Sequence, residues 1–293
     1  MLLLQSMQGE SMSVLRKLSH CLPDELYIQL QYFHHFHKFA NLKHPQTFNE
    51  KLNWLKLHDR NPLYTTLVDK YAVKQWVADK IGAQYIIPTL GLWNKAEDID
   101  FDKLPHQFVL KCTHDSHSIV ICRDKSKLDK PQTIKKLSAR LKSNGYWYGR
   151  EWPYKNVPPR IIAEKYMEDC ATHELHDYKF FCFNGNAKLM YISKDIASDP
   201  RTDFFNMAGE HISLRMLDRN SDTVPHLPAQ FPAMRELAEK LSLGIPFLRV
   251  DFYIIEGKIY FGELTFYHAS GYAPLRPASW NNTLGSYICL PSK

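Results

Sequence analysis

Two adjacent stretches near the C-terminus alternate apolar and polar residues. Residues 248–255 and 258–265 each carry this two-residue period, and Glu256-Gly257 stands between them. The period predicts two strands, and a Glu-Gly pair between strands predicts a tight turn. We therefore expect an antiparallel hairpin at this point of the chain.

The polar residues of this hairpin are the first candidates for a functional site. Arg249 and Asp251 share one face of the first strand, as Glu263 and Thr265 do in the second. Pairing about the turn brings Asp251 and Glu263 together at the end away from it. Two carboxylates and an arginine among apolar residues are costly to bury, and a divalent cation that also binds a polyphosphate would neutralise the carboxylates. The alternative is a solvent-facing hairpin with ordinary surface charges.

The rest of the chain divides into helical and strand-like segments. Thr47 followed by Glu50 is typical of a capping box at the start of a helix. The remaining pattern predicts, in chain order, a helical region over 1–45, a helix over 62–81, a short strand or strand pair over 85–93, a hairpin over 108–122, a basic helix over 131–143, an aromatic loop over 144–152, a strand over 160–167, a hairpin over 177–192, a polar, loop-rich segment over 195–222 and a helix over 232–243. This order of helices and antiparallel strand pairs predicts an α+β fold.

Composition narrows the class of protein and of ligand. The chain has 293 residues, 44% hydrophobic and 23% charged, which is ordinary for a globular protein of two or three lobes. Its formal net charge of +6 suits anionic ligands such as nucleotides or acidic sugars, and is too small to indicate a nucleic-acid-binding protein. Six cysteines without a CxxC pair argue against a zinc site and a disulfide framework. With no apolar run of 18 residues, we expect a cytoplasmic protein without a transmembrane segment; peripheral membrane contact stays open.

A second set of candidates lies on the strands predicted on either side of the basic helix. Lys111 stands in an apolar strand directly before a polar turn at 113–118. It can reach an α- or β-phosphate while backbone N–H groups of the turn cradle the γ-phosphate. A lysine that extends to solvent is the alternative. Glu164-Lys165 follows a β-branched strand that can present backbone groups to an adenine edge. No Rossmann or P-loop motif occurs in the chain.

The order of these pieces resembles the ATP-grasp superfamily. From about residue 44 to the end, the chain resembles the TupA-like ATP-grasp proteins of bacterial surface-polysaccharide loci. The segments that carry the resemblance are TFNEKL at 47–52, DKY at 69–71, VLKC at 109–112 with HDS at 114–116, DYKF at 177–180 with CFNG at 182–185, and RVDFY at 249–253 with GELTF at 262–266. The resemblance implies two α+β lobes that clamp ATP. It divides the chain into a helical region over 1–68, a lobe with the phosphate hairpin over 69–163 and a lobe with the metal hairpin over 164–293.

The resemblance also implies roles for individual residues. Lys111 would bind the α- and β-phosphates, and Arg249 would stabilise the transferring phosphoryl group. Asp251, Glu263 and Thr265 would hold magnesium. The other residues expected to bind ATP are Asp115, Ser116 and Ser118 in the turn, Glu164, Lys165 and Met167 beside the adenine, and Asp177 and Lys179 in the DYKF block. His117 stands where relatives often carry glycine, and Thr265 where many ligases carry a metal-binding asparagine.

The activity that the resemblance implies is that of a carboxylate–amine ligase that uses ATP and Mg²⁺. The expected substrates are a sugar carboxylate, such as a uronic acid, and an amino acid or amino sugar, joined through an acyl phosphate in surface-polysaccharide (capsule or O-antigen) biosynthesis. We expect the acceptor pocket near Trp147, Trp152 and residues 195–222. Three alternatives stay open: a glycosyltransferase, for which 98–100 (DID) is the nearest metal motif; an ATP-grasp kinase; and a binding module without turnover.

Overall fold

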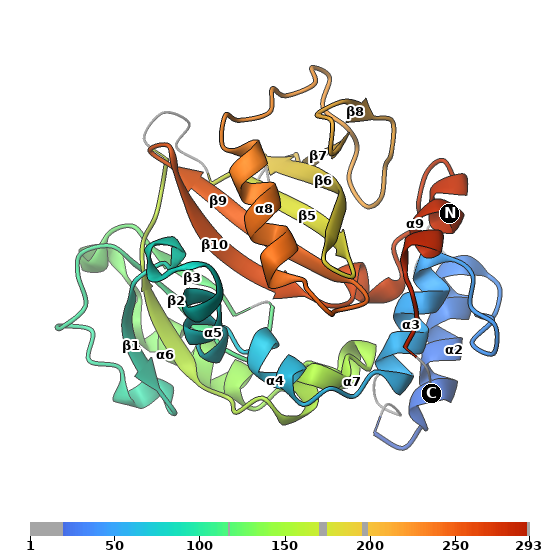
Figure 1. The fold of residues 1–293 in the computed structure, drawn as a ribbon. Helices are drawn as coiled ribbons and strands as arrows, with labels where there is room; N and C mark the ends of the chain where they lie inside the picture. The colour runs from blue at the N-terminus through green and yellow to red at the C-terminus, as the bar shows by residue number, and fades with distance from the viewer. Residues whose placement is uncertain (1–19, 117, 170–174, 195–198, 292–293) are drawn as a thin grey trace.

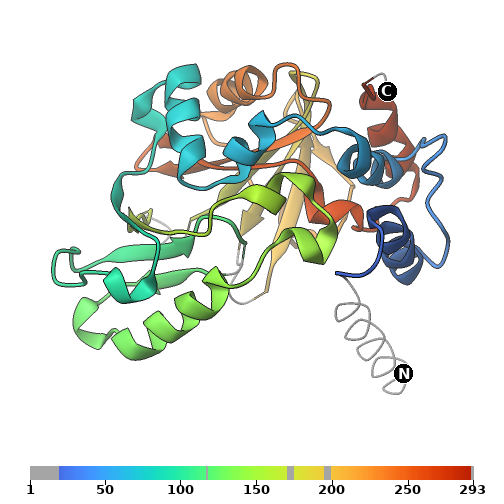
Figure 2. The ribbon, with the colours of Figure 1, turned by 90° about the horizontal axis from the view of Figure 1, so that it is seen from below.

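The computed structural model describes residues 20–116, 118–169, 175–194 and 199–291. Within these ranges the chain forms two antiparallel sheets with helices packed around them, so the predicted α+β class is confirmed (Figure 1). The smaller sheet has the strand order β1-β4-β2-β3, and the larger has the order β10-β9-β5-β6-β7-β8. Seen from below, the smaller sheet and the long helix α6 project to one side of the larger sheet (Figure 2).

Helix α3 packs against the last helix of the chain. Helix α3 (Phe48–His58) lies beside α9 (Ser279–Tyr287), and α2 (Asp24–Phe36) contacts α3 (Figure 1). Gly285 of α9 lies so close to the start of α3 that a Cβ atom there would stand 2.2 Å from the carbonyl oxygen of Gln46. Only glycine permits this approach, which fixes the C-terminal segment against the N-terminal helices.

The capping box predicted at the start of α3 is confirmed. The Thr47 hydroxyl accepts a hydrogen bond from the Glu50 N–H at 3.3 Å, and the Glu50 carboxylate accepts one from the Thr47 N–H at 3.1 Å. The same carboxylate accepts from the N–H groups of Asn41 and Gln46. Glu50 therefore ties the loop before the helix to its first turn.

Thr47→Ala is expected to lower the free energy of unfolding by about 1 kcal/mol, because it removes the acceptor for a first-turn N–H group. Urea unfolding followed by circular dichroism measures the change. Thr223→Ala, at an exposed position in a loop, is the matched control and should leave the midpoint unchanged. Equal urea midpoints for Thr47→Ala and the unsubstituted chain would show that the Thr47 cap does not contribute to the free energy of unfolding.

The single helix predicted over 62–81 is wrong, because Asp69 divides it. The structure has α4 (Leu63–Val68) and α5 (Ala72–Ile81) instead. Asp69 is extended, with ψ 114°, and its carboxylate accepts hydrogen bonds from the N–H groups of Tyr71 at 2.8 Å and Ala72 at 3.2 Å. The other carboxylate oxygen lies 2.6 Å from the Arg160 guanidinium. A buried carboxylate that caps α5 and pairs with an arginine outweighs the preference for a continuous helix.

The smaller sheet contains the strands on either side of the polar turn predicted at 113–118. Its strands are β1 (Thr89–Trp93), β2 (Phe108–Cys112), β3 (Val120–Cys122) and β4 (Ile161–Lys165), and all neighbours are antiparallel. The strand or strand pair predicted over 85–93 is correct only for β1. Ala83–Tyr85 forms a 3-10 helix, η1, and Pro88 has no N–H to donate to the sheet. Helix α6 (Lys130–Leu141) packs on β2 and buries Leu137.

The aromatic loop predicted over 144–152 is also wrong. Its centre is a short helix, α7 (Tyr146–Gly149), and Trp152–Asn156 forms a 3-10 helix, η4. Arg150 ends α7 in the left-handed conformation, and its guanidinium is fully buried over the rings of Tyr27 and Trp147. These cation–π contacts and an ion pair with Asp24 at 3.1 Å join α7 to α2, which no local pattern reveals.

The larger sheet contains two of the three predicted hairpins, and the third, over 108–122, is the β2–β3 pair of the smaller sheet. Its strands are β5 (Asp177–Phe183), β6 (Asn186–Lys194), β7 (Arg201–Asn206), β8 (His211–Ile212), β9 (Leu248–Ile255) and β10 (Lys258–Thr265). The loop predicted over 195–222 is wrong for β7 and β8. The short run Phe204-Phe205 is buried on both faces, which hides the two-residue period of a strand. Helix α8 (Phe231–Leu241) packs on β5, β6 and β9.

Both hairpin turns place a non-glycine residue and a glycine at positive φ. Asn184 and Gly185 have φ 48° and 83°, and Glu256 and Gly257 have φ 51° and 75°. Two successive positive φ angles match the twist of the paired strands. The turn predictions are therefore confirmed, including the less common Glu-Gly pair.

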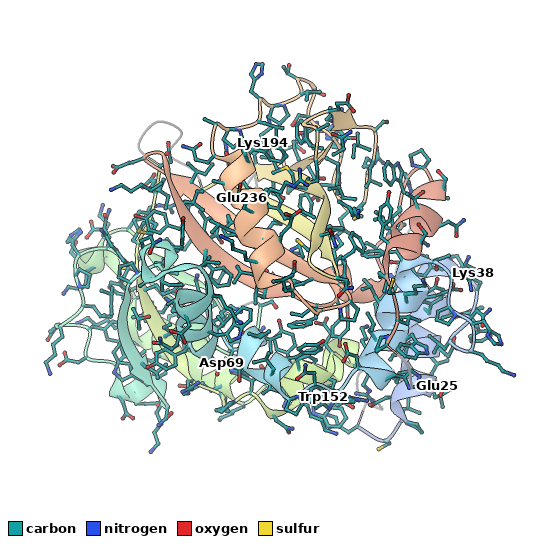
Figure 3. All side chains as sticks on the ribbon, viewed as in Figure 1. Glu25, Lys38, Asp69, Trp152, Lys194 and Glu236 are labelled. Atoms are coloured by element: carbon teal, nitrogen blue, oxygen red, sulfur yellow. The ribbon has the colours of Figure 1, made fainter. Side chains whose placement is uncertain are left out.

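Two separate apolar clusters hold the sheets. One is shared by the larger sheet and the N- and C-terminal helices, and the other lies between the smaller sheet and α6. Asp69 and Trp152 lie between these parts, whereas Lys194 and Glu236 lie on the part built around the larger sheet (Figure 3).

Cys21, Cys112, Cys122, Cys182 and Cys289 are free thiols. None of the helices in the described ranges has the length and apolar character needed to cross a membrane.

Candidate functional site

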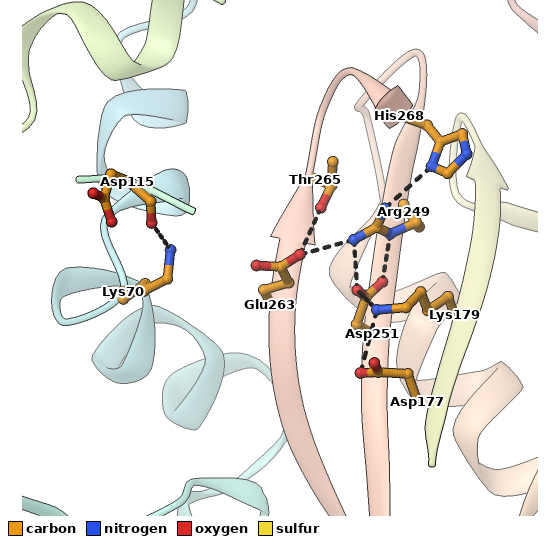
Figure 4. Close-up of polar contacts among 9 residues, drawn as sticks. All are labelled: Lys70, Asp115, Asp177, Lys179, Arg249, Asp251, Glu263, Thr265 and His268. Carbon is orange, nitrogen blue, oxygen red and sulfur yellow. Dashed lines mark hydrogen bonds and ion pairs between the residues drawn. The ribbon is translucent and has the colours of Figure 1, made fainter. Parts of the chain in front are cut away.

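Polar side chains gather on three neighbouring strands of the larger sheet (Figure 4). Strand register brings them together, because Lys179 pairs with Asp251 across β5 and β9, and Arg249 pairs with Thr265 across β9 and β10. The β9–β10 register shifts between Phe261 and Leu264. An irregularity of this kind turns a side chain out of the regular alternation. The residues brought together are Asp177, Lys179, Arg249, Asp251, Glu263 and Thr265, and the polar cluster below means these six.

Arg249 is the centre of the polar cluster. Its guanidinium donates to both carboxylate oxygens of Asp251, each at 2.7 Å, and to Glu263 Oε1 at 2.8 Å. Its Nη1 lies 3.1 Å from His268 Nδ1. Arginine has no acceptor, so His268 Nδ1 accepts this bond and the imidazole carries its proton on Nε2. Burial and the charges of Arg249 and Lys179 hold the pKa of His268 well below its usual value, so the ring stays neutral.

Lys179 bridges two carboxylates on neighbouring strands. Its Nζ lies 2.8 Å from Asp251 Oδ2 and 3.2 Å from Asp177 Oδ1. Burial raises the pKa of Asp251, but Arg249 and Lys179 outweigh it and lower the pKa overall. Burial instead prevails at Asp177, whose pKa is raised. Asp251 is thus held ionised between two cations in a fully buried position.

The polar cluster suits magnesium when phosphate supplies the remaining ligands. Its three carboxylates outnumber its two cationic side chains, which leaves a formal excess of one negative charge. Glu263 is the most accessible of the three carboxylates, with a side chain 42% accessible. In the described ranges no three His, Cys, Asp or Glu side chains form a complete metal site. Mg²⁺ commonly binds one or two carboxylates together with substrate phosphates, so the donor set fits. Thr265 donates to Glu263 Oε1 at 3.3 Å and adds a hydroxyl beside it.

A second ionic cluster lies on the smaller sheet. The Glu164 carboxylate contacts Lys111 Nζ at 2.7 Å and Lys74 Nζ at 2.5 Å. Burial raises the pKa of Glu164, and the two ammonium groups outweigh it, so the pKa is lowered. Lys111 and Glu164 come from paired strands β2 and β4, and Lys74 comes from α5. The lysine assigned to the phosphates therefore lies beside the glutamate assigned to the adenine border.

Side chains hold the turn after β2. Ser118 Oγ accepts from the Cys112 N–H at 2.7 Å and donates to Asp115, which also pairs with Arg140 at 2.9 Å. Lys70 donates to the Asp115 carbonyl oxygen (Figure 4). Ser116 is exposed. His117 lies outside the described residues.

The remaining predicted nucleotide contacts lie at the end of β4. Lys165 is exposed, and its N–H donates to the Pro88 carbonyl oxygen at 3.0 Å. Met167 is partly exposed. The roles of both beside an adenine stay predictions.

Carboxylates from both sheets act on the same tyrosines. Asp177 and then burial raise the pKa of Tyr253 well above its usual value, and Glu164 of the smaller sheet adds to them. Burial raises the pKa of Tyr154, with contributions from Glu263 and from Asp115 of the turn. Asp115 and Tyr154 also line one cavity, so the turn after β2 lies beside this tyrosine.

Three residues of this region were missed by reading the sequence. His268 orients Arg249, Lys74 shares Glu164 with Lys111, and Arg140 fixes Asp115. Each lies in a segment whose local pattern is that of an ordinary helix or turn. Only the tertiary pairing of distant segments identifies them.

The chain is similar to solved structures of ligases and of an ATP-grasp protein, at low sequence identity. The chain is 16% identical to D-alanine–D-alanine ligase from Bacillus anthracis (TM-score 0.41; 69% of this chain and 54% of that chain) and 14% identical to the Helicobacter pylori enzyme (TM-score 0.47; 83% and 69%). It is 10% identical to a RimK domain ATP-grasp protein from Sphaerobacter thermophilus (TM-score 0.42; 77% and 69%). The chain thus spans about half the length of the first. No curated protein matches it.

The family comparison covers most of the chain. The family model described as TupA-like ATPgrasp matches residues 50–289, a range that contains both ionic clusters and the turn between β2 and β3. The chain belongs to the TupA-like ATPgrasp family.

Proposed function

We propose that this protein is an ATP-dependent carboxylate–amine ligase that forms an amide on a sugar carboxylate in bacterial surface-polysaccharide biosynthesis. The observation that carries the proposal is the polar cluster around Arg249, whose carboxylates outnumber its cations by one and whose Glu263 is the most accessible of them. The smaller sheet supplies a phosphate-binding cation, Lys111, beside Glu164. A site that binds ATP and magnesium needs this combination of carboxylates and phosphate-binding cations. Membership of the TupA-like ATPgrasp family supports it.

The residues of this chain divide the work of phosphoryl transfer. Lys111 holds the α- and β-phosphates, and Asp115, Ser116 and Ser118 shape the turn over the γ-phosphate. The described contacts of Arg249 use all but one of its N–H donors, which leaves one on Nη1 for a phosphoryl oxygen. Magnesium, when bound by Asp251 and Glu263, supplies neutralisation of phosphate charge.

The reaction needs no protein nucleophile. A carboxylate oxygen of the substrate attacks the γ-phosphorus, the bond to the β-phosphate oxygen breaks, and ADP leaves. The amine nitrogen then attacks the acyl carbon, and the carbon–oxygen bond to phosphate breaks. The protein contributes orientation and charge stabilisation to both steps.

A substrate panel tests this function. The protein is incubated with ATP, Mg²⁺, uronic acids and amino acids, and ADP, AMP and phosphate are followed. Release of ADP and phosphate that depends on both a carboxylate and an amine supports the ligase. A phosphorylated product formed without an amine would identify a kinase, and consumption of a UDP-sugar without ATP would refute the proposal.

A further inference from the structure

A cavity of about 670 Å³ lies on the side of the turn after β2 that faces the N- and C-terminal helices. Asp115 and Ser116 of the turn form one wall, and Gln31 of α2 and Tyr272 contribute others. This volume is in the range of small-molecule sites. Gln31 precedes the segment that the family comparison matches, so part of the cavity wall lies outside the matched range.

The cavity wall includes a strained turn. Ala269, Ser270 and Gly271 are successive residues with φ of 45°, 53° and 69°. Left-handed backbone disfavours alanine and serine, and it persists only where the surroundings enforce it. Lys56 Nζ donates to the Ser270 carbonyl oxygen at 2.6 Å, and Asn53 Nδ2 donates to the Gly271 carbonyl oxygen at 3.1 Å. Helix α3 therefore holds Ser270 in place at the cavity.

Ser270 links a carboxylate in the cavity wall to a buried ammonium group. Its hydroxyl accepts from Lys56 Nζ at 3.2 Å and hydrogen-bonds Glu151. Gly149 leaves the space for this contact, because a Cβ atom there would stand 2.1 Å from Ser270 Oγ and 3.2 Å from Glu151 Oε1. Gly149, Glu151 and Ser270 all line the cavity. Burial lowers the pKa of Lys56 to about 7 and raises that of Glu151.

We propose that this cavity receives the amine co-substrate, and that Glu151 binds its ammonium group and accepts the proton the nitrogen loses before it attacks. The proposal rests on the proposed ligase function. A carboxylate in the wall attracts an ammonium group and repels a second carboxylate, and Asp115 and Ser116 place the cavity beside the predicted γ-phosphate site.

The step balances in atoms and charge. The ammonium gives one proton to Glu151, and the neutral nitrogen forms a bond to the acyl carbon as the carbon–oxygen bond to phosphate breaks. The nitrogen loses its second proton to the leaving phosphate, which departs as hydrogen phosphate. Ser270 Oγ accepts from the Lys56 ammonium group, and the charge of Lys56 opposes the rise that burial causes in the pKa of Glu151, which favours the ionised carboxylate that has to take this proton.

A labelling experiment tests the charge preference of the cavity without relying on turnover. Ser270→Cys is allowed to react with cationic aminoethyl and anionic sulfonatoethyl methanethiosulfonate, and mass spectrometry reads the modification at position 270. Adding Glu151→Gln should lower the cationic-to-anionic rate ratio by about 10-fold, because one negative charge beside the thiol is lost. Glu151→Asp should keep the ratio, and Glu236→Gln, at an exposed position on α8, is the control. An unchanged ratio in Glu151→Gln would overturn the proposal.

A second experiment uses hydroxylamine, a nucleophile that is uncharged at neutral pH and does not need Glu151 to remove a proton. It tests whether the acyl phosphate forms independently of binding of the amine. With hydroxylamine in place of the amino acid, Glu151→Gln should form hydroxamate at the unsubstituted rate, whereas amide formation should fall by about 100-fold or more. Equal amide formation in both proteins would overturn the role of Glu151. Failure of the unsubstituted protein to form any hydroxamate would count against the ligase function instead, and the labelling result would then decide the cavity alone.

Discussion

Asp251→Asn and Glu263→Gln are expected to remove ATP-dependent turnover alike but to differ sharply in their effect on stability. Each substitution removes one of the two carboxylates assigned to magnesium. We expect kcat to fall by roughly 100-fold or more in either variant, which is the scale for removing one group that stabilises transition-state charge. The predicted difference lies in the free energy of unfolding.

Burial decides that difference. The Asp251 side chain is 1% accessible and bonds to Arg249 through both oxygens and to Lys179 through one. An asparagine would remove the carboxylate that both buried cations share, leaving Arg249 with only the half-exposed Glu263 and Lys179 with only Asp177. Breaking a buried ion pair costs about 3–5 kcal/mol. Glu263 is 42% accessible, and Arg249 keeps Asp251 when Glu263 is neutral, so Glu263→Gln should cost about 1 kcal/mol or less.

Urea unfolding and titration with ATP at fixed Mg²⁺ measure the two effects separately. Retained Mg²⁺-dependent ATP binding in Glu263→Gln, at unchanged stability, would contradict the metal assignment. Glu236→Gln, at an exposed position on α8, is the control and should change neither measurement. If Asp251→Asn is too unstable to purify, Glu263→Gln still decides the metal assignment.

The hairpin of β9 and β10 shows which features the local sequence pattern can predict and which it cannot. Alternation and the Glu-Gly turn predict both strands, and the proximity of Asp251 and Glu263 follows from the pairing. The shift in register between Phe261 and Leu264 cannot be predicted this way. Nor can the presence of Lys179 beside Asp251, because the pairing of β5 with β9 joins segments about 70 residues apart in sequence.

The same limit applies to the cavity beside the turn after β2. The acceptor pocket was predicted near Trp147, Trp152 and residues 195–222. Neither tryptophan is among the described residues that line the cavity, whereas their neighbours Tyr148 and Glu151 and, from the polar segment, Leu217 do line it. Lys56 and Ser270 have no such signal. Lys56 has the spacing of an ordinary helical residue, and its burial depends on the packing of α3 against the turn at 269–271. Tertiary contacts, rather than composition, create its perturbed pKa.

Lys111→Met is expected to weaken ATP binding by roughly 10- to 100-fold, the equivalent of about 1.5–3 kcal/mol for a hydrogen bond to a charged group. Lys111 and Lys74 both contact Glu164, but they come from different elements, β2 and α5. Either lysine alone keeps the buried Glu164 paired. Lys111→Met should therefore lose affinity for the nucleotide without the larger loss of stability expected when a buried carboxylate is left unpaired.

Lys74→Met is the matched control, because it removes an ammonium group from the same carboxylate. Lys74 also donates to the Ile87 carbonyl oxygen at 2.8 Å, which directs it toward the segment before β1. We expect ATP affinity within about threefold of the unsubstituted protein for Lys74→Met. Isothermal titration with ATP and Mg²⁺, alongside urea unfolding, compares the two variants. Equal losses of affinity would mean that the lysines act only by holding Glu164, and the assignment of Lys111 to the phosphates would then be wrong.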